Sequence, residues 1–231
     1  MLNVLRQEEK YPLNLQEAIQ FSHCFSQLLM PDQYSVDGSY MIRSLYFDTV
    51  DDKDFFDKIT EQNARRKIRL RVYSPEDERA KLEMKQKNGS YQRKRSLSIS
   101  KADALALIDG NYSVLLHYSE EFAAELYAIM TMECYRPKSI VEYQRRAFMA
   151  KENNIRLTFD SRICATESSM ELFHPHLPLN LVFDADKVIF EVKYDRFMLG
   201  YISEIISNVN RRSISSSKYC LSRSIGYPLQ T

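Results

Sequence analysis

Positive charges alternate with aliphatic side chains through Arg65–Tyr73, and this pattern constrains the fold more than any other. In a β-strand, side chains two residues apart share a face. One face of such a strand carries Arg65, Lys67, Arg69 and Arg71, whereas the other is mostly aliphatic. For a single strand, the simplest interpretation is an amphipathic strand that keeps its cations in water.

Several other segments repeat this alternation with their own charges. The faces that they predict carry Glu83, Lys85 and Lys87; Arg93 and Arg95; Lys187, Glu191 and Lys193; Arg6, Glu8 and Lys10; Tyr143 and Arg145; and Arg156, Thr158 and Asp160. A closed or nearly closed antiparallel sheet would collect these faces in one interior. Enclosing so much positive charge is costly unless an anion fills the interior. The sequence therefore predicts a basic tunnel for a polyanion.

The charge balance argues against a general nucleic-acid-binding protein. The chain has 32 Lys and Arg against 31 Asp and Glu, a formal net charge of +1. A nucleic-acid coat would need a net basic surface. The charge pattern runs from end to end, so we expect one domain over residues 1–231. There is no signal peptide or apolar run of membrane-spanning length, which predicts a cytoplasmic chain that reaches a membrane only through a partner protein.

Other common reactive groups give little signal. Four widely spaced cysteines predict free thiols in a reducing compartment: Cys24, Cys134, Cys164 and Cys220. His174 and His176 have no third ligand within sequence reach, which favours solvated side chains over a metal site. With only 5 Gly, the sequence contains no Gly-rich phosphate loop, and no Ser-His-Asp or Cys-His constellation stands out.

Periodicity and turn signals predict the elements in order. The expected strands are Leu2–Tyr11, Tyr40–Asp48, Arg65–Tyr73, Arg79 or Lys81 to Lys87, Tyr91–Ile99, Pro137–Ala150, Ile155–Asp160 and one within Val182–Tyr194. Helices are expected after Asn14, after Thr49 or Asp51, after Ser100, and over Ser119–Cys134 and Phe197–Asn208, with a last short element from Ser215. Asn88-Gly89 predicts a tight hairpin turn.

Carboxylates among these cations have two interpretations that spacing alone leaves open. Glu8, Glu83 and Glu191 either neutralise neighbouring cations or include a ligand for Mg²⁺ or Mn²⁺. These hard ions are often held by a few carboxylates together with substrate phosphates. Arg and Lys suit phosphate because Arg offers a planar fork of donors and Lys a compact charge.

Six segments occur in the order found in VTC domains, and the chain resembles this family over nearly its whole length. The segments are RQEEKY at 6–11, SLYFDT at 44–49, KIRLRVY at 67–73, LEMKQK at 82–87, EVKY at 191–194 and SKY at 217–219. VTC domains are the polyphosphate polymerase domains of the vacuolar transporter chaperone type, within the triphosphate tunnel metalloenzyme (CYTH-like) superfamily. The resemblance implies an α+β fold in which an eight-stranded antiparallel β-barrel tunnel is flanked by helices.

The resemblance also implies a reaction and a set of site residues. The terminal phosphoryl group of ATP would pass to a growing polyphosphate chain, and the nucleoside diphosphate would be released. Mn²⁺ or Mg²⁺ would be the cofactor. By match to the family motifs, the phosphate-binding residues would be Lys10, Arg69, Arg71, Lys85, Arg145, Arg156, Lys193 and Lys218. The charge pattern adds Lys67, Lys87 and Arg93. The expected catalytic residues are Lys10, Arg69, Arg71, Lys85 and Lys193.

The implied metal ligands are Glu191 first, then Glu8 and Glu83, whereas Asp48 is expected to shape the tunnel mouth. In phosphoryl transfer a protein mainly positions an in-line attack and stabilises phosphate charge, so no side-chain nucleophile is required. Arg6 stands where the hydrolytic branch of the superfamily has a glutamate, which favours the polymerase. Two alternatives remain open: a hydrolase of inorganic triphosphate or nucleoside triphosphates, and a non-catalytic module that binds polyphosphate or inositol phosphates.

Overall fold

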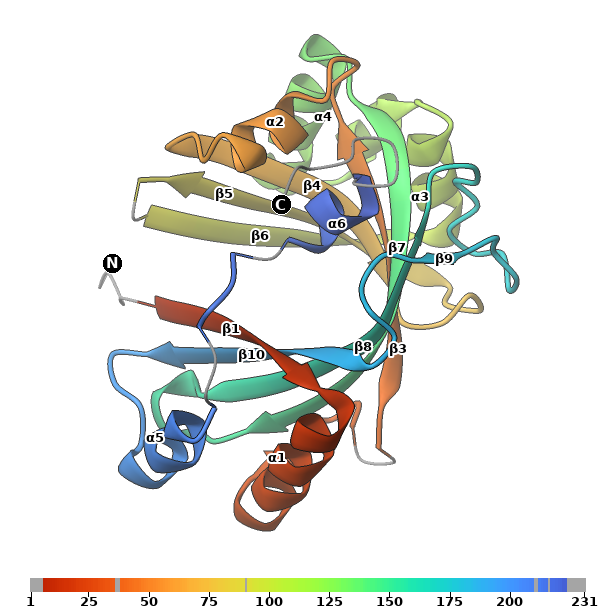
Figure 1. The fold of residues 1–231 in the computed structure, drawn as a ribbon. Helices are drawn as coiled ribbons and strands as arrows, with labels where there is room; N and C mark the ends of the chain where they lie inside the picture. Colours follow the sequence, from red (N-terminus) through yellow and green to blue (C-terminus); the bar gives the residue numbers. More distant parts are fainter. Residues whose placement is uncertain (1–5, 36–37, 90, 210–211, 216, 224–231) are drawn as a thin grey trace. The chain divides into compact units, whose positions relative to one another are not determined.

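An antiparallel sheet flanked by helices forms the scaffold (Figure 1). The computed structural model describes residues 6–35, 38–89, 91–209, 212–215 and 217–223. The strands are β1 Arg6–Asn14, β2 Met30–Pro31, β3 Tyr40–Asp48, β4 Ala64–Val72, β5 Arg79–Asn88, β6 Tyr91–Ser100, β7 Arg136–Met149, β8 Arg156–Thr166, β9 Asn180–Leu181 and β10 Lys187–Asp195. The helices are α1 Leu15–Leu28, α2 Lys53–Ile59, α3 Lys101–Ile108, η1 Tyr112–His117, α4 Glu121–Met132, η2 Glu152–Asn154, α5 Gly200–Ser207 and α6 Lys218–Arg223.

Eight long strands follow the order β1-β10-β8-β7-β3-β4-β5-β6, and the two-residue strands β2 and β9 pair with β7 and β8. This confirms the predicted α+β class with an antiparallel sheet. The expectation of a closed barrel needs correction, because within the described part of the chain β1 and β6 end this order without pairing with each other. The backbone of Ile214 lies along β1 instead, where its N–H donates to the Lys10 carbonyl oxygen at 2.8 Å.

The chain separates into two compact units, so the predicted single domain remains a prediction. Unit 1 contains residues 1–41, 143–163 and 183–217, and unit 2 contains residues 42–142, 164–182 and 218–231. Strands β3, β7 and β8 each contribute residues to both units. The two units are described separately below.

In unit 1, α1 and α5 cover the apolar face of the sheet (Figure 1). Phe25 of α1 packs with Phe159 of β8 and Phe190 of β10, and the last two rings stack with centroids 4.7 Å apart. Val188 and Val192 flank Phe190 in this core. Because alternate residues of a strand point to opposite faces, this packing turns Glu191 and Lys193 to the other face.

The beginning of unit 1 departs from the prediction at Pro12. The first strand does not stop there but continues to Asn14, with Pro12 opposite Ile189. Proline is tolerated because, among the described strands, β1 pairs only with β10, so its missing N–H breaks no ladder on the other side. The predicted cap of α1 is confirmed: Asn14 and Glu17 exchange side-chain to backbone hydrogen bonds of 2.8 Å. Residues 2–5 of the predicted strand lie outside the described residues.

In unit 2, α3, η1 and α4 cover one face of β4, β5 and β6 (Figure 1). The core on this face combines aliphatic residues of the strands with those of the helices: Ile68, Leu70, Leu82, Met84, Leu97, Leu107, Leu115, Leu126 and Met130. The predicted Ser100 cap is confirmed, since its hydroxyl accepts from the Asp103 N–H at 3.1 Å. Gly89 adopts φ +59°, as the predicted hairpin turn at Asn88-Gly89 requires. The helical layer forces the alternating cations of β4 onto the opposite face.

Candidate phosphate-binding site

Unit 2 presents a face of three neighbouring strands that is rich in cations, here called the cation face. Strand pairing places opposite residues on one side of a sheet. The residues placed there by the register are Arg65, Lys67, Arg69 and Arg71 of β4; Lys81, Glu83, Lys85 and Lys87 of β5; and Gln92, Lys94, Ser96 and Ser98 of β6. Glu83 is the one carboxylate of these strands on this face. The predicted alternation of β4 therefore holds, and β5 and β6 extend it.

Three lysines form a row across the cation face. Lys67 lies opposite Lys85, and Lys85 lies opposite Lys94. Lys85 and Lys94 are exposed, and Lys67 is half-buried. Like charges placed directly opposite one another destabilise a sheet. Glu83 offsets part of this repulsion through Lys94, and the row as a whole suits a ligand with several negative charges.

Glu83 lies among cations from two neighbouring strands. Its carboxylate accepts from Arg69 Nε at 2.7 Å, lies 2.5 Å from Lys94 Nζ and 3.6 Å from Arg71 Nη2. Burial alone would raise the pKa of Glu83, but the charges of Arg69 and Lys94 outweigh it and hold that pKa below its usual value. The surroundings of Glu83 thus favour the neutralising interpretation over a metal-binding one.

Arg69 is oriented by a tyrosine as well as by Glu83. Its Nη1 donates to the Tyr46 hydroxyl at 3.0 Å, and Tyr46 lies directly opposite it on β3. The Tyr46 ring stacks on Tyr219 of α6, with centroids 5.1 Å apart. The SLYFDT and SKY segments therefore meet beside a predicted phosphate-binding arginine.

Unit 1 carries a second charged face, with carboxylates and cations in alternation. Lys10 lies opposite Glu191 and Glu8 opposite Lys193 in the β1–β10 pair. Lys10 Nζ is 3.0 Å from Glu8, and Lys193 Nζ is 2.5 Å from Glu191. Burial alone would lower the pKa of Lys10, but Glu191 and Glu8 outweigh it and raise that pKa.

Arg145 sits deeper in unit 1, where Asp160 binds two of its nitrogens. Nε and Nη2 donate to the two carboxylate oxygens at 2.6 and 2.7 Å, and Asp160 is fully buried. Arg145 Nη2 is also 3.9 Å from Glu191. Burial would lower the pKa of Arg145, but Asp160 raises it well above its usual value. Arg145 is therefore a permanent charge whose orientation is set by Asp160.

Arg156 and Lys193 lie opposite each other in the β10–β8 pair. Arg156 Nη2 donates to Asp32 at 2.7 Å and to the Tyr40 hydroxyl at 3.2 Å. The alignment of Arg156, Thr158 and Asp160 on one face, predicted from spacing, is confirmed by the register against Lys193, Glu191 and Ile189.

Comparison with known families decides the classification. The sequence profile of the VTC domain matches residues 5–227, which spans both units. The chain belongs to the VTC domain family. This membership connects the chain with the handling of polyphosphate. A search of curated proteins found no match.

Two solved structures are similar to this VTC domain at low sequence identity. A "putative adenylate cyclase" from Bacillus halodurans has a TM-score of 0.52 at 13% identity, with 92% of this chain and 95% of that chain covered. The PH1819 protein from Pyrococcus horikoshii has a TM-score of 0.46 at 9% identity, with 93% and 97% covered. At these identities the likeness concerns the fold alone.

The register of this VTC domain keeps Arg93 and Arg95 on one face, as predicted from spacing, but places that face away from the cation face. Arg93 lies opposite Gln86, and Arg95 lies opposite Met84, so both point to the face that α4 covers. Arg95 accordingly donates to Glu125 of α4 at 2.6 Å. Lys94, which was not predicted from the sequence as a phosphate-binding residue, lies on the cation face opposite Lys85. The two-residue connection after Asn88 could have identified it, because that connection sets which residues of β6 oppose Lys85.

Asp48 of the SLYFDT segment has a structural role. The buried carboxylate accepts from the N–H groups of Asp54 and Phe55 at 2.9 Å, so it caps the start of α2. Thr49 adds a second cap, since its hydroxyl accepts from the Lys53 N–H at 3.0 Å. The N-cap position of α2 is held by Asp52, so neither Thr49 nor Asp51, the two predicted caps, is the N-cap residue. The Asp48 carboxylate also accepts from the hydroxyl of Tyr219, next to Lys218.

The predicted metal ligands do not form a preassembled site. Among the described residues, no group of three or more His, Cys, Asp or Glu is arranged to hold a metal ion. Glu191 and Glu8 share a face of unit 1, and each is paired with a lysine. Mg²⁺ is commonly bound by one or two carboxylates together with substrate phosphates. Glu191 and Glu8 fit a site of that kind, completed by phosphate oxygens.

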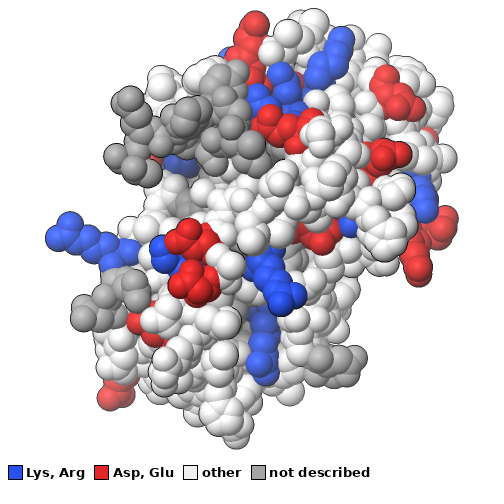
Figure 2. Space-filling model, turned by 45° about the vertical axis from the view of Figure 1, so that its right-hand side comes forward, with Lys and Arg blue, Asp and Glu red and all other residues white. Residues whose placement is uncertain are grey.

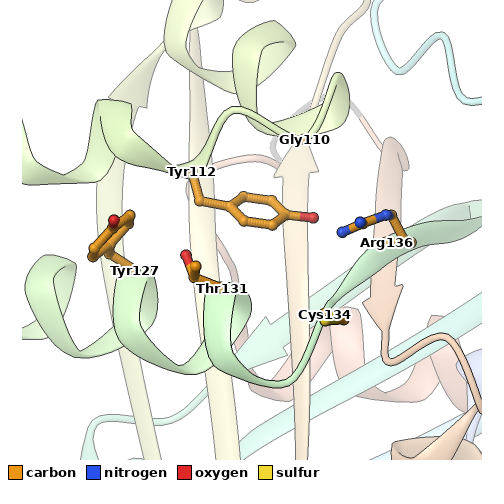
Figure 3. A pocket seen from close by; sticks show the side chains of 6 residues that line it. All are labelled: Gly110, Tyr112, Tyr127, Thr131, Cys134 and Arg136. Atoms are coloured by element: carbon orange, nitrogen blue, oxygen red, sulfur yellow. The ribbon is translucent and has the colours of Figure 1, made fainter.

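A cavity of about 300 Å³ lies in the helical layer of unit 2 (Figure 3). It is lined by Gly110, Tyr112, Tyr127, Thr131, Cys134 and Arg136. Tyr112 and Arg136 both donate to the Tyr135 carbonyl oxygen, at 2.5 and 2.6 Å. These helices pack on the apolar face of the strands, so the cavity is separate from the cation face.

Three further observations bear on the sequence predictions. None of the four cysteines forms a disulfide, as predicted. In the part of the chain that the structure describes, no helix is long and apolar enough to cross a membrane. On the described part of the face in Figure 2, Lys and Arg side chains are interspersed with Asp and Glu. This mixture agrees with the net charge of +1 and differs from a nucleic-acid-binding coat.

Proposed function

We propose that this VTC domain is a polyphosphate polymerase that transfers the terminal phosphoryl group of ATP to a growing polyphosphate chain. The observation that supports this most directly is the lysine row Lys67-Lys85-Lys94 on the cation face. Opposed like charges lower the stability of the free protein. A bound chain of phosphates would neutralise this row, so the sheet suits a linear polyanion better than a single phosphate.

The chemistry needs few protein groups beyond these cations. The attacking group is a phosphate oxygen of the acceptor chain, which is already ionised near neutral pH. This oxygen attacks the γ-phosphorus of ATP and forms a new P–O bond. The bond between the γ-phosphorus and the β–γ bridging oxygen breaks, and ADP leaves. Arg69, Arg71 and Lys85 would bind and orient phosphates on the cation face, while Lys10 and Lys193 would do so in unit 1. Their charges would stabilise the oxygens of the transferred group.

The divalent metal remains a proposal that rests on Glu191 and Glu8. When bound, Mn²⁺ or Mg²⁺ would neutralise phosphate charge beside these carboxylates. Glu83, surrounded by Arg69, Arg71 and Lys94, would serve as a counter-charge that orients Arg69.

Incubation with γ-labelled ATP and Mn²⁺, followed by separation of products by size, tests the proposal. A polymerase places label in a ladder of long anionic chains, and Lys85→Ala should reduce the ladder. Label released only as free phosphate would favour the hydrolase. Label that stays on ATP would contradict both enzymes.

A binding module is the remaining alternative, and binding measurements separate it from the enzymes. The parent protein and Glu191→Gln would be titrated with tripolyphosphate in the presence of Mn²⁺. Equal affinity for both, together with no turnover by the parent, would support the module. If the protein is a polymerase, the parent should turn over ATP, and Glu191→Gln should lower that turnover.

A further inference from the structure

Two buried polar atoms on neighbouring strands of unit 2 lack hydrogen-bond partners. They are Ser44 Oγ of β3 and Arg71 Nε of β4. Ser44 is 1% exposed and Arg71 is 9% exposed. Buried polar groups in proteins nearly always have a partner, and one without a partner costs free energy. Two such atoms in one place therefore call for an explanation.

The two atoms are chemically complementary. Ser44 and Arg71 lie directly opposite each other in the β3–β4 pair and share the side of the sheet that carries the cation face. Arg71 Nε carries a hydrogen to donate, and a serine oxygen can accept it. Opposed side chains of an antiparallel pair are close enough to interact. A hydrogen bond between them would satisfy both atoms.

In the ligand-free protein, Arg71 is drawn toward a different group. Its Nη2 lies 3.6 Å from Glu83, which is already hydrogen-bonded to Arg69 and close to Lys94. A phosphate on the cation face would compete with Glu83 for the outer nitrogens of Arg71. Turning of the guanidinium toward that phosphate would bring Nε, which has no partner, within reach of an acceptor on its own side, and Ser44 is the opposed residue.

We propose that Ser44 is a positioning residue for Arg71: when phosphate binds, Arg71 Nε donates to Ser44 Oγ, and the outer guanidinium nitrogens are held toward the phosphate. This inference rests on the proposed function, since it assumes a polyphosphate ligand on the cation face. The free protein carries the cost of two unsatisfied atoms, and the bound state removes it. The hydrogen bond therefore adds to affinity without stabilising the free fold.

A double-mutant cycle with tripolyphosphate as the probe tests the proposal by calorimetric titration. Ser44→Ala should weaken binding about 10- to 100-fold, the range for a hydrogen bond to a charged group. In an Arg71→Ala background, the same change should alter affinity less than about twofold, because Ser44 acts through Arg71. The thermal midpoint of ligand-free Ser44→Ala should not fall, since the hydroxyl that is removed has no partner.

Ser22→Ala is the matched control. Ser22 of α1 is another buried serine whose hydroxyl lacks a partner, and it lies in unit 1. Its removal should leave tripolyphosphate affinity unchanged. Equal binding by the parent and Ser44→Ala would overturn the positioning role while leaving the proposed function intact. An equal loss in the Arg71→Ala background would also overturn it. A parent protein that binds no tripolyphosphate would overturn both proposals.

Discussion

The Tyr219 hydroxyl donates to Asp48 Oδ2 at 2.6 Å across a sequence separation of 171 residues. Both residues are buried, and the same carboxylate caps α2 through the N–H groups of Asp54 and Phe55. One side chain thus holds the start of α2 and the short helix α6 together. Burial raises the pKa of Tyr219, with the Asp48 charge adding to it, so the phenol remains a donor at neutral pH.

Removing the Tyr219 hydroxyl should lower stability by about 1–3 kcal/mol, because a charge-assisted hydrogen bond is lost in a buried place. Urea denaturation of Tyr219→Phe measures this. Tyr201→Phe is the control, since Tyr201 is 45% exposed. Equal stability of the two variants would show that the Asp48 contact contributes nothing to docking of α6.

Asp160→Ala should destabilise the protein by about 3–5 kcal/mol, because it leaves the buried Arg145 guanidinium without its main partner. The double variant Asp160→Leu/Arg145→Met should recover most of this loss, since it removes both charges and keeps apolar volume. Thermal unfolding compares the three proteins. A double variant no more stable than Asp160→Ala would mean that the pair is needed for more than charge balance.

Lys85→Gln should raise the stability of the ligand-free protein by about 0.5 kcal/mol, because it relieves repulsion from Lys67 and Lys94. The same variant should gain less stability than the parent when tripolyphosphate is added, since one phosphate-binding charge is missing. Urea denaturation with and without tripolyphosphate measures both effects.

Arg93→Gln provides the control for the lysine row, because Arg93 lies on the opposite face of the same hairpin. It should leave stabilisation by tripolyphosphate unchanged. A loss equal to that of Lys85→Gln would contradict the assignment of phosphate binding to one face.

Stability should fall as pH rises through the range in which Asp54 titrates. Burial, reinforced by the charge of Asp48, raises the pKa of Asp54 from 3.8 to about 7. Between these values the folded protein holds a proton that the unfolded chain has released, so the free energy of unfolding decreases with increasing pH. The effect is at most about 4 kcal/mol, since each pKa unit corresponds to about 1.4 kcal/mol.

Asp54→Asn should remove this part of the pH dependence, which urea denaturation at pH 5, 6, 7 and 8 would reveal. Tyr135 donates to Asp54 Oδ2 at 2.8 Å, and an asparagine oxygen can accept the same bond. Glu83 works in the opposite direction, because its lowered pKa gives stability that is lost as pH falls below its usual range. A profile for Asp54→Asn parallel to that of the parent between pH 5 and 8 would contradict the raised pKa.

Local patterns were sufficient to predict the long strands, the helices α1 to α5 and the cation face of β4, but not the short elements β2, β9, η1 and η2. Side chains alternate between the two faces of a strand, so Arg69 and Arg71 lie on the face opposite Leu70. Because the aliphatic face is buried, the other face must carry the cations. The Asn14 and Ser100 caps could also be predicted, because a helix cap depends only on residues within one turn. Glu191 and Lys193 were assigned to one face for the same reason as the β4 cations.

Contacts between distant segments were decided only by the tertiary structure. The opposition of Ser44 and Arg71 depends on which strands pair, and the bond between Tyr219 and Asp48 on where α6 packs. The sequence by itself determined which side chains alternate along each strand, because alternation is a property of a single strand. Packing determined which charges meet, because each such contact joins residues that no local pattern relates.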